Sequence, residues 1–265
     1  MVFGFLRPKS RSKSQTASAD GRVVYGVGDI HGRLDLLDQL LDAVAADFAA
    51  LGRTDRPVIV FVGDYVDRGP ESAGVIERIA ALKAASGGPS GFEVRALMGN
   101  HEQTLLQFLD SPEGGPVWAE FGGGETLASY GVARPAGRDP EAWRAAQEQF
   151  QRNLPLRHLN FLRQLELTAA YGDYLFVHAG VRPGRSLVEQ DPQDLLWIRG
   201  DFLHQPHGLG MVVVHGHTPD EEPFLGRDRI NVDTGAYATG VLTAVRVGEG
   251  APAMLQARKR RPVPG

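Results

Sequence analysis

The chain has 265 residues, of which 42% are apolar and 23% charged, values typical of a soluble globular protein with one large or two small domains. It contains no cysteine, which excludes disulfides, thiolate zinc sites and cysteine nucleophiles, so any metal site must use oxygen and imidazole ligands. The net charge is −4 and the two ends are basic, so the body is acidic and a poor candidate for nucleic-acid binding.

The two ends of the chain differ in composition from the middle. Residues 1–20 are rich in Ser, Lys and Arg without periodicity and predict a disordered basic tail, and residues 251–265 predict a second basic tail. No apolar run reaches the roughly 20 residues that span a bilayer, and the apolar stretch at the N-terminus is too short for a signal peptide. We therefore expect a cytoplasmic protein with no transmembrane segment.

The first half alternates apolar runs with helical patterns. In chain order it predicts a strand at 23–27, a helix at 34–50, a strand at 58–62, a helix at 72–85, a strand at 94–98 and a helix from near 102. Each predicted strand ends at a short polar motif. This order favours an α/β core, in which the loops at the carboxyl ends of the strands bind ligands.

Residues 110–170 break this pattern. Glycine-rich turns and helical stretches near 141–152 and 155–166 predict a helical insertion. Strands are then expected at 174–177, 211–214, 229–232 and 241–247, with the last two forming a hairpin-like pair.

Six polar motifs follow these apolar runs. They are Gly28-Asp-Ile-His-Gly32, Gly63-Asp-Tyr-Val-Asp-Arg-Gly69, Gly99-Asn-His-Glu102, His178-Ala-Gly180, Trp197-Ile-Arg199 and His215-Gly-His-Thr-Pro219. One such motif means little, because an Asp at the end of a strand is usually a turn residue or a helix cap. Six motifs that coincide with the ends of apolar runs predict a two-metal site that holds a phosphate.

The motifs offer two sets of candidate metal ligands. Asp29 and His31 lie on one tight turn, and the carboxylate of Asp64 could bridge two cations. The candidates for the second cation are Asn100, His178 and either His215 or His217. Oxygen and imidazole ligands suit Mn, Fe, Zn or Ni, and two ions about 3.5–4 Å apart suit displacement at phosphorus.

Other motif residues suit the remaining tasks of phosphate chemistry. Arg68 and Arg199 can hold phosphate oxygens with forked guanidinium donors. His101 directly follows a candidate ligand and is placed to protonate a leaving alkoxide, and Asp67 could orient it.

The motifs resemble the signature of the phosphoprotein phosphatase branch of calcineurin-like metallophosphoesterases, over about residues 22–247. The run Gly63-Asp-x-Val-Asp-Arg-Gly69 is specific to that branch, and Gly216-His-Thr-Pro219 looks more like its bacterial and phage serine/threonine phosphatases. The resemblance implies an α/β (α+β) catalytic domain over 21–250, built as a two-sheet β-sandwich flanked by helices, with a dinuclear centre.

The resemblance also assigns roles to residues. It implies that one metal is held by Asp29, His31 and Asp64, and the other by Asp64, Asn100, His178 and His217. It implies that His101 is the general acid with Asp67 as partner, and that Arg68 and Arg199 bind phosphate. It favours His217 over His215 as the ligand, which leaves His215 as a supporting or substrate-side residue.

The leading hypothesis is a metal-dependent phosphomonoesterase that hydrolyses phosphoserine and phosphothreonine in proteins by direct attack of a metal-bridged hydroxide, with two divalent ions, Mn favoured over Fe, Zn or Ni. A symmetrical diadenosine tetraphosphate hydrolase is an alternative that shares much of the motif set. A non-catalytic metal-bound scaffold is a third, against which the intact His101, Asp67 and Arg68 argue. The expected partner is a phosphorylated protein, with no nucleic acid, and no pattern specifies an oligomeric state.

Overall fold

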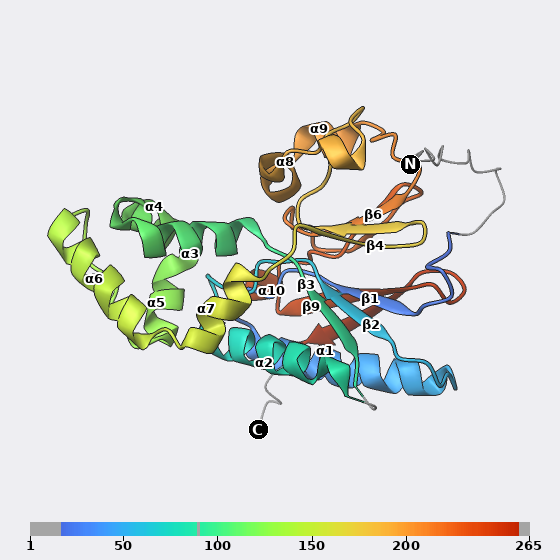
Figure 1. The fold of residues 1–265 in the computed structure, drawn as a ribbon, viewed down its shortest axis with the longest axis horizontal. Helices are drawn as coiled ribbons and strands as arrows, with labels where there is room; N and C mark the ends of the chain where they lie inside the picture. Colours follow the sequence, from blue (N-terminus) through green and yellow to red (C-terminus); the bar gives the residue numbers. More distant parts are fainter. Residues whose placement is uncertain (1–16, 89–90, 260–265) are drawn as a thin grey trace, which may run out of the picture.

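The computed structural model describes residues 17–88 and 91–259, which form two five-stranded sheets packed against each other with helices outside (Figure 1). Apolar side chains of both sheets form the core between them, among them Val24 and Val60 from one sheet and Phe176 and Val214 from the other. The predicted fold, a two-sheet sandwich flanked by helices, is confirmed.

The first sheet has the strand order β10-β9-β1-β2-β3. Its strands are β1 (Val24–Val27), β2 (Val58–Phe61), β3 (Glu93–Ala96), β9 (Val241–Val247) and β10 (Ala253–Arg258). β1, β2 and β3 run parallel, and β9 and β10 are antiparallel to their neighbours. Because the parallel strands share one direction, the loops that follow them meet at one edge of the sheet.

The second sheet has the order β4-β5-β6-β8-β7. Its strands are β4 (Thr168–Tyr171), β5 (Tyr174–Val177), β6 (Val212–His215), β7 (Phe224–Leu225) and β8 (Arg229–Asn231). β5, β6 and β8 are parallel to one another, so a second set of loops also opens at one edge.

Helices cover both outer faces. α1 (Leu34–Ala50) and α2 (Ser72–Ala84) pack on the first sheet, and α8 (Pro192–Trp197) and α9 (Gly200–His204) pack on the second (Figure 1). Short elements complete the chain: α10 (Ala236–Thr239) and 3₁₀ turns at Ala85–Gly87 and Leu187–Glu189.

The segment expected to be a helical insertion is a helical lobe that projects beside the sheets (Figure 1). It contains α3 (Asn100–Asp110), a 3₁₀ turn (Pro112–Gly114), α4 (Gly115–Trp118), a π-helical turn (Ala119–Gly123), α5 (Gly124–Ser129), α6 (Pro140–Asn153) and α7 (Leu156–Arg163). Its core is aromatic, with the Phe108 ring 4.8 Å from that of Trp118 and 6.1 Å from that of Trp143. No helix in the described ranges is long and apolar enough to cross a membrane.

Two expectations about strands are wrong. The strands at 229–232 and 241–247 are not a hairpin, because β8 pairs with β6 and β7 in the second sheet while β9 pairs with β1 and β10 in the first. The predicted tail at 251–265 contains β10, an edge strand of half-buried residues that pairs with β9 from Ala253 to Arg258. Residues 260–265 lie outside the described residues.

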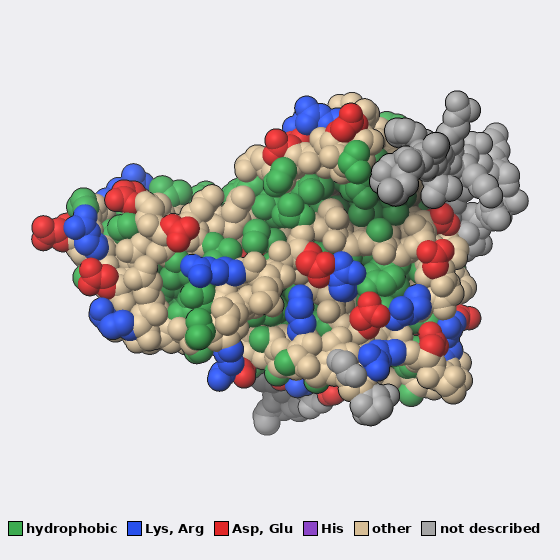
Figure 2. Space-filling model, viewed as in Figure 1, with side chains coloured by type: hydrophobic (Ala, Val, Ile, Leu, Met, Phe, Trp, Pro, Cys, Tyr) green, Lys and Arg blue, Asp and Glu red, His purple; other side chains and the backbone are tan. Residues whose placement is uncertain are grey.

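The predicted N-terminal tail lies mostly outside the described residues, which begin at 17. Its last residues belong to the body, because Ala19 is buried and the amide of Ser18 donates to Asp173. On the face drawn in Figure 2, basic and acidic side chains of the described residues are interspersed. On this face, the described residues therefore do not form a single basic stripe.

Candidate metal centre

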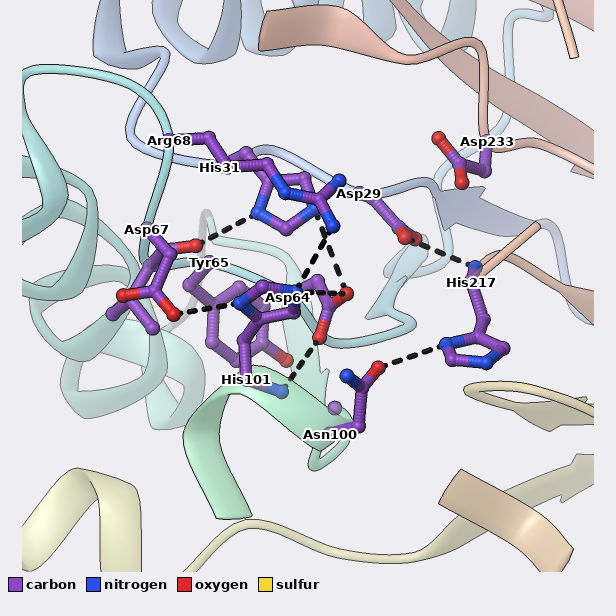
Figure 3. A network of polar contacts seen from close by, with 12 residues as sticks. Asp29, His31, Asp64, Tyr65, Asp67, Arg68, Asn100, His101, His217 and Asp233 are labelled. Atoms are coloured by element: carbon purple, nitrogen blue, oxygen red, sulfur yellow. Dashed lines mark hydrogen bonds and ion pairs between the residues drawn. The ribbon is translucent and has the colours of Figure 1, made fainter. Parts of the chain in front are cut away.

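The motif residues meet where the loops of the two sheets converge. Asp29 and His31 follow β1, Asp64 follows β2, and Asn100 begins α3, the helix that follows β3 (Figure 3). His178 and His217 come from the second sheet, after β5 and β6. The side chains of Asp29, His31, Asp64, His178 and His217 are almost fully buried.

Two groups of possible ligands share Asp64. One is His31, Asp64 and His101 and the other is Asp64, His178 and His217, and within each group the ligand atoms lie within 4.8 Å of one another. Asp64 Oδ2 is 3.5 Å from His31 Nε2, whereas Asp64 Oδ1 is 3.4 Å from His178 Nε2. Each oxygen of one carboxylate thus faces a different group, which is the arrangement that a bridge between two cations needs.

Buried atoms without partners support a cation at this place. Asp29 Oδ1 and His217 Nε2 are buried and have no hydrogen-bond partner among the described residues. Burial, and then the charges of Asp233 and Asp64, raise the pKa of Asp29 well above its ordinary value. Buried polar atoms are rarely left unpaired, and crowded buried carboxylates need a positive charge nearby. The residues therefore fit a divalent-metal centre.

The ring nitrogens of two histidines are oriented by backbone carbonyls. His31 Nδ1 is 2.8 Å from the carbonyl of Val66, and His178 Nδ1 is 2.9 Å from that of Val62. A nitrogen that donates to a carbonyl carries the proton, which leaves Nε2 of each ring as the nitrogen that could bind a metal. His31 Nε2 lies near Asp64, and His178 Nε2 lies near both Asp64 and Asn100 Oδ1, the latter at 2.8 Å. Burial lowers the pKa of His31 to about 3 and also lowers that of His178, so both rings are neutral, as metal ligation requires.

Strained backbone conformations are concentrated at this site. Six non-glycine residues of the described part have positive φ, and all except Asp20 are motif residues: His31, Asp64, Asp67, Arg68 and His217. Such conformations cost about 1–3 kcal/mol each and persist only where the surroundings hold them. At Gly99, a Cβ atom would lie 2.2 Å from Asp64 Oδ1, so only glycine allows α3 to start this close to the shared carboxylate.

Glu102, in the third motif but given no role from the sequence, holds the turn that carries Asp64. Its two carboxylate oxygens accept hydrogen bonds from the amides of Asp64, Tyr65 and Gly99 at 2.8–3.0 Å. Burial, and then the charge of Asp64, raise the pKa of Glu102 to about 7. The sequence feature that could have identified Glu102 is its position in the run Gly99-Asn-His-Glu102.

His101 and Asp67 form a buried pair, with His101 Nδ1 2.6 Å from Asp67 Oδ2. Burial opposes a charge on the imidazole, but Asp64 and Asp67 outweigh it, so the pKa of His101 is raised. Asp67 is itself held by the helical lobe, because Trp118 Nε1 donates to Oδ2 at 2.8 Å and Thr126 Oγ1 donates to Oδ1 at 2.6 Å. No sequence pattern points to Trp118 or Thr126, because both lie more than 50 positions from Asp67.

The two candidate phosphate arginines lie on different sides of the centre. Arg68 is half-buried, with Nη2 3.3 Å from His101 Nε2 and its guanidinium 4.6 Å from the centre of the Tyr237 ring. Arg199 is exposed and donates to Thr218 Oγ1 at 3.3 Å. Its charge contributes, after burial and other groups, to lowering the pKa of His178 and His217. Arg199 therefore lies near the second group of ligands.

His215, expected to be a supporting or substrate-side residue, is packed inside the protein. Its side chain is fully buried, with its ring edge-on to Phe202 at 4.9 Å and Nε2 3.5 Å from Arg229. β6 ends at His215, and His217 beyond it has a left-handed φ of 66°, so the strand rule that puts residues i and i+2 on one face no longer applies. His217 lies against Asn100, with Nδ1 2.8 Å from Asn100 Oδ1, and its role as a metal ligand stays a prediction.

Comparison with known proteins agrees with this geometry. The bis(5'-nucleosyl)-tetraphosphatase PrpE [asymmetrical] of Oceanobacillus iheyensis is 28% identical over 243 residues, covering 84% of this chain and 88% of the relative. A crystal structure of a provisionally assigned diadenosine tetraphosphatase has a TM-score of 0.60 at 20% identity, covering 89% of this chain and 94% of the other. A serine/threonine phosphatase from Saccharomyces cerevisiae has a TM-score of 0.56 at 17% identity, covering 91% and 81%.

The last two likenesses concern the fold alone. The model of one family, calcineurin-like phosphoesterase, matches residues 23–242. That range includes both groups of candidate ligands, the His101–Asp67 pair and both arginines. The chain therefore belongs to the calcineurin-like phosphoesterase family.

Proposed function

We propose that the protein is a metal-dependent hydrolase of dinucleoside tetraphosphates that cleaves the phosphoanhydride chain asymmetrically. The observation that carries the chemistry is the Asp64 carboxylate, whose two oxygens face different histidine groups. The choice of substrate is supported by the relative from Oceanobacillus iheyensis, a bis(5'-nucleosyl)-tetraphosphatase that aligns along most of both chains. The leading hypothesis from the sequence is a protein phosphatase, so this proposal names a different substrate. The alternative is a symmetrical diadenosine tetraphosphate hydrolase, which breaks a different bond of the phosphate chain.

The proposed roles follow from the contacts of each residue. Asp29, His31, Asp64, Asn100, His178 and His217 would hold two divalent ions. Such ions lower the pKa of coordinated water and neutralise charge on phosphate oxygens. Arg68 and Arg199 would hold further phosphate oxygens from either side. His101, whose pKa is raised by Asp64 and Asp67 against burial, would donate a proton from Nε2 to the leaving oxygen.

A second candidate is the phosphomonoesterase that acts on phosphoserine and phosphothreonine. The observation that favours it is the His101–Asp67 pair, because a serine alkoxide is a strongly basic leaving group that needs a proton. A nucleotide phosphate leaves more readily, since its oxygen titrates with a pKa near 6. A protonated His101 would therefore matter more for a phosphomonoester than for a phosphoanhydride.

Product analysis separates these functions. The Mn-loaded protein is incubated with diadenosine tetraphosphate and, in parallel, with a panel of phosphoserine and phosphothreonine peptides. We expect ATP and AMP in equal amounts, whereas a symmetrical hydrolase yields ADP alone. Phosphate release from the peptides with no nucleotide product would overturn the proposal. The Asp64→Asn variant serves as a control for contaminating enzymes and should be inactive on both substrates.

A further inference from the structure

We propose that Trp197 and Tyr237 are base-stacking residues at opposite ends of the metal centre, each placed to receive one nucleobase of a dinucleoside polyphosphate. The inference rests on the proposed function and deepens it by assigning residues to the two ends of the substrate. It starts from two large aromatic side chains that remain exposed, 40% for Trp197 and 38% for Tyr237.

Each ring lies against a histidine of a different ligand group. The Tyr237 ring is edge-on to His31, with 5.3 Å between ring centres, and the Trp197 ring is edge-on to His217 at 6.3 Å. His31 and His217 belong to the two groups that share Asp64. The two aromatic rings therefore lie beside different ligand groups of the shared carboxylate.

An arginine accompanies each ring. The guanidinium of Arg68 lies 4.6 Å from the centre of the Tyr237 ring, and Arg199 follows Trp197 by two residues. A nucleotide presents a flat aromatic base and an anionic phosphate, which aromatic rings and guanidinium groups recognise respectively. Arg199 donates to Thr218, next to His217, so each ligand group has an aromatic ring and an arginine near it. This suits a ligand with two nucleoside ends and a phosphate chain between them.

The Trp197 ring is held in place rather than left free. Its Nε1 donates to Gln103 Oε1 at 2.7 Å, which ties the end of α8 to α3 of the helical lobe. A ring that is oriented before the ligand arrives loses less conformational freedom on binding. Among the described residues, the other exposed aromatic side chains are Phe121 and Phe224. Neither ring contacts a candidate ligand histidine among those residues.

Phe224 provides a matched control. It is 43% exposed and has the guanidinium of Arg229 4.1 Å from its ring centre, so it repeats the aromatic–arginine pair away from the ligand groups. The test compares Trp197→Leu, Tyr237→Leu, the double variant and Phe224→Leu. Trp197→Phe and Tyr237→Phe keep a ring and should restore most of the binding. Melting temperatures establish that each variant is folded.

The first measurement is binding of AMP and of ribose 5-phosphate to the Mn-loaded protein by calorimetry, because these probes differ only in the base. Loss of stacking should weaken AMP binding to the double variant about fivefold or more, and leave ribose 5-phosphate and the Phe224→Leu protein unchanged. Equal weakening of both probes would overturn the inference, since it would mean that Tyr237 only supports Arg68. Unchanged AMP binding would overturn it too.

The second measurement is the KM for diadenosine tetraphosphate, which each single leucine variant should raise about fivefold or more. An effect at only one position would overturn the two-ended arrangement. If the wild-type protein does not cleave the dinucleotide, the proposed function fails by itself, while the comparison of AMP with ribose 5-phosphate still decides whether these rings bind bases.

Discussion

The indole N–H of Trp118 donates to Asp67 Oδ2, the same oxygen that lies 2.6 Å from His101 Nδ1. A residue of the helical lobe thereby fixes the carboxylate that orients the proposed general acid. The lobe is thus connected to the centre of the site by a direct hydrogen bond as well as by the chain.

Replacing Trp118 should therefore slow the chemical step. We expect Trp118→Phe to lower kcat by about tenfold with little change in KM, because the lost bond is made to a buried carboxylate. Trp143→Phe is the matched control: its side chain is also buried in the lobe against Phe108, but its Nε1 donates to the carbonyl of Gly137. Equal losses of kcat in both variants would mean that the effect is only loss of packing.

The role of His101 should depend on the leaving group. With a phosphoserine peptide, His101→Ala should lower kcat by roughly 10²–10⁴-fold, the usual contribution of a general acid. With diadenosine tetraphosphate the loss should be clearly smaller, because the leaving nucleotide phosphate needs less protonation. Steady-state kinetics on both substrates measures the difference, and an unchanged rate on both would remove His101 from the mechanism.

Metal binding should stabilise the fold and should depend on His217 rather than His215. A ligand that binds only the folded state raises the melting temperature, and a concentration 100 times Kd contributes about 2.7 kcal/mol. We expect Mn²⁺ to raise the melting temperature of the wild type and of His215→Asn, and to have little effect on His217→Asn or Asp29→Asn. Loss of the shift in His215→Asn, with retention in His217→Asn, would reverse the assignment.

Glu93 should make stability depend on pH in the acidic range. It receives hydrogen bonds from Arg22 at 2.7 Å and from the Tyr171 hydroxyl at 2.8 Å, and so joins β3 to β4 of the other sheet. Burial opposes ionisation, but these partners outweigh it and lower the pKa of Glu93 below its ordinary value of 4.5. The stabilisation is complete above that value and is lost as the pH falls through the lowered pKa.

Urea unfolding of Glu93→Gln tests this sign. At pH 7 the variant should be less stable than the wild type by up to about 1 kcal/mol, since the ion pair is partly exposed. The two proteins should converge as the pH falls through the lowered pKa of Glu93. A difference that stayed constant across this range would show that the Glu93 charge contributes nothing.

Much of the fold follows from local patterns. The helix at 34–50 and the strands at 174–177 and 241–247 have the predicted bounds, because hydrophobic periodicity is a local property. Strand pairing is not local. The strands at 229–232 and 241–247 are close in sequence but belong to different sheets. The sequence does not indicate β10, because its mostly half-buried residues precede a basic run.

The residues of the candidate site also differ in how well the sequence predicts them. The motif residues could be named because Asp, His and Arg in glycine-flanked turns are rare at the ends of several successive apolar runs. Trp118 and Thr126 could not, because they reach Asp67 only through the folding of the lobe. Alternation along a strand could not distinguish His215 from His217, because His217 lies beyond β6 with a left-handed φ that no residue pattern encodes.

The spread of the two ligand groups along the chain has a consequence for biosynthesis. Asp29, His31 and Asp64, the proposed ligands of one ion, belong to the first 64 residues, whereas the proposed ligands of the other ion include His178 and His217. Because the chain leaves the ribosome from its N-terminus, one set of ligands is present long before the other. The two ions would then be acquired in a fixed order, and the second could enter only after the second sheet had docked on the first.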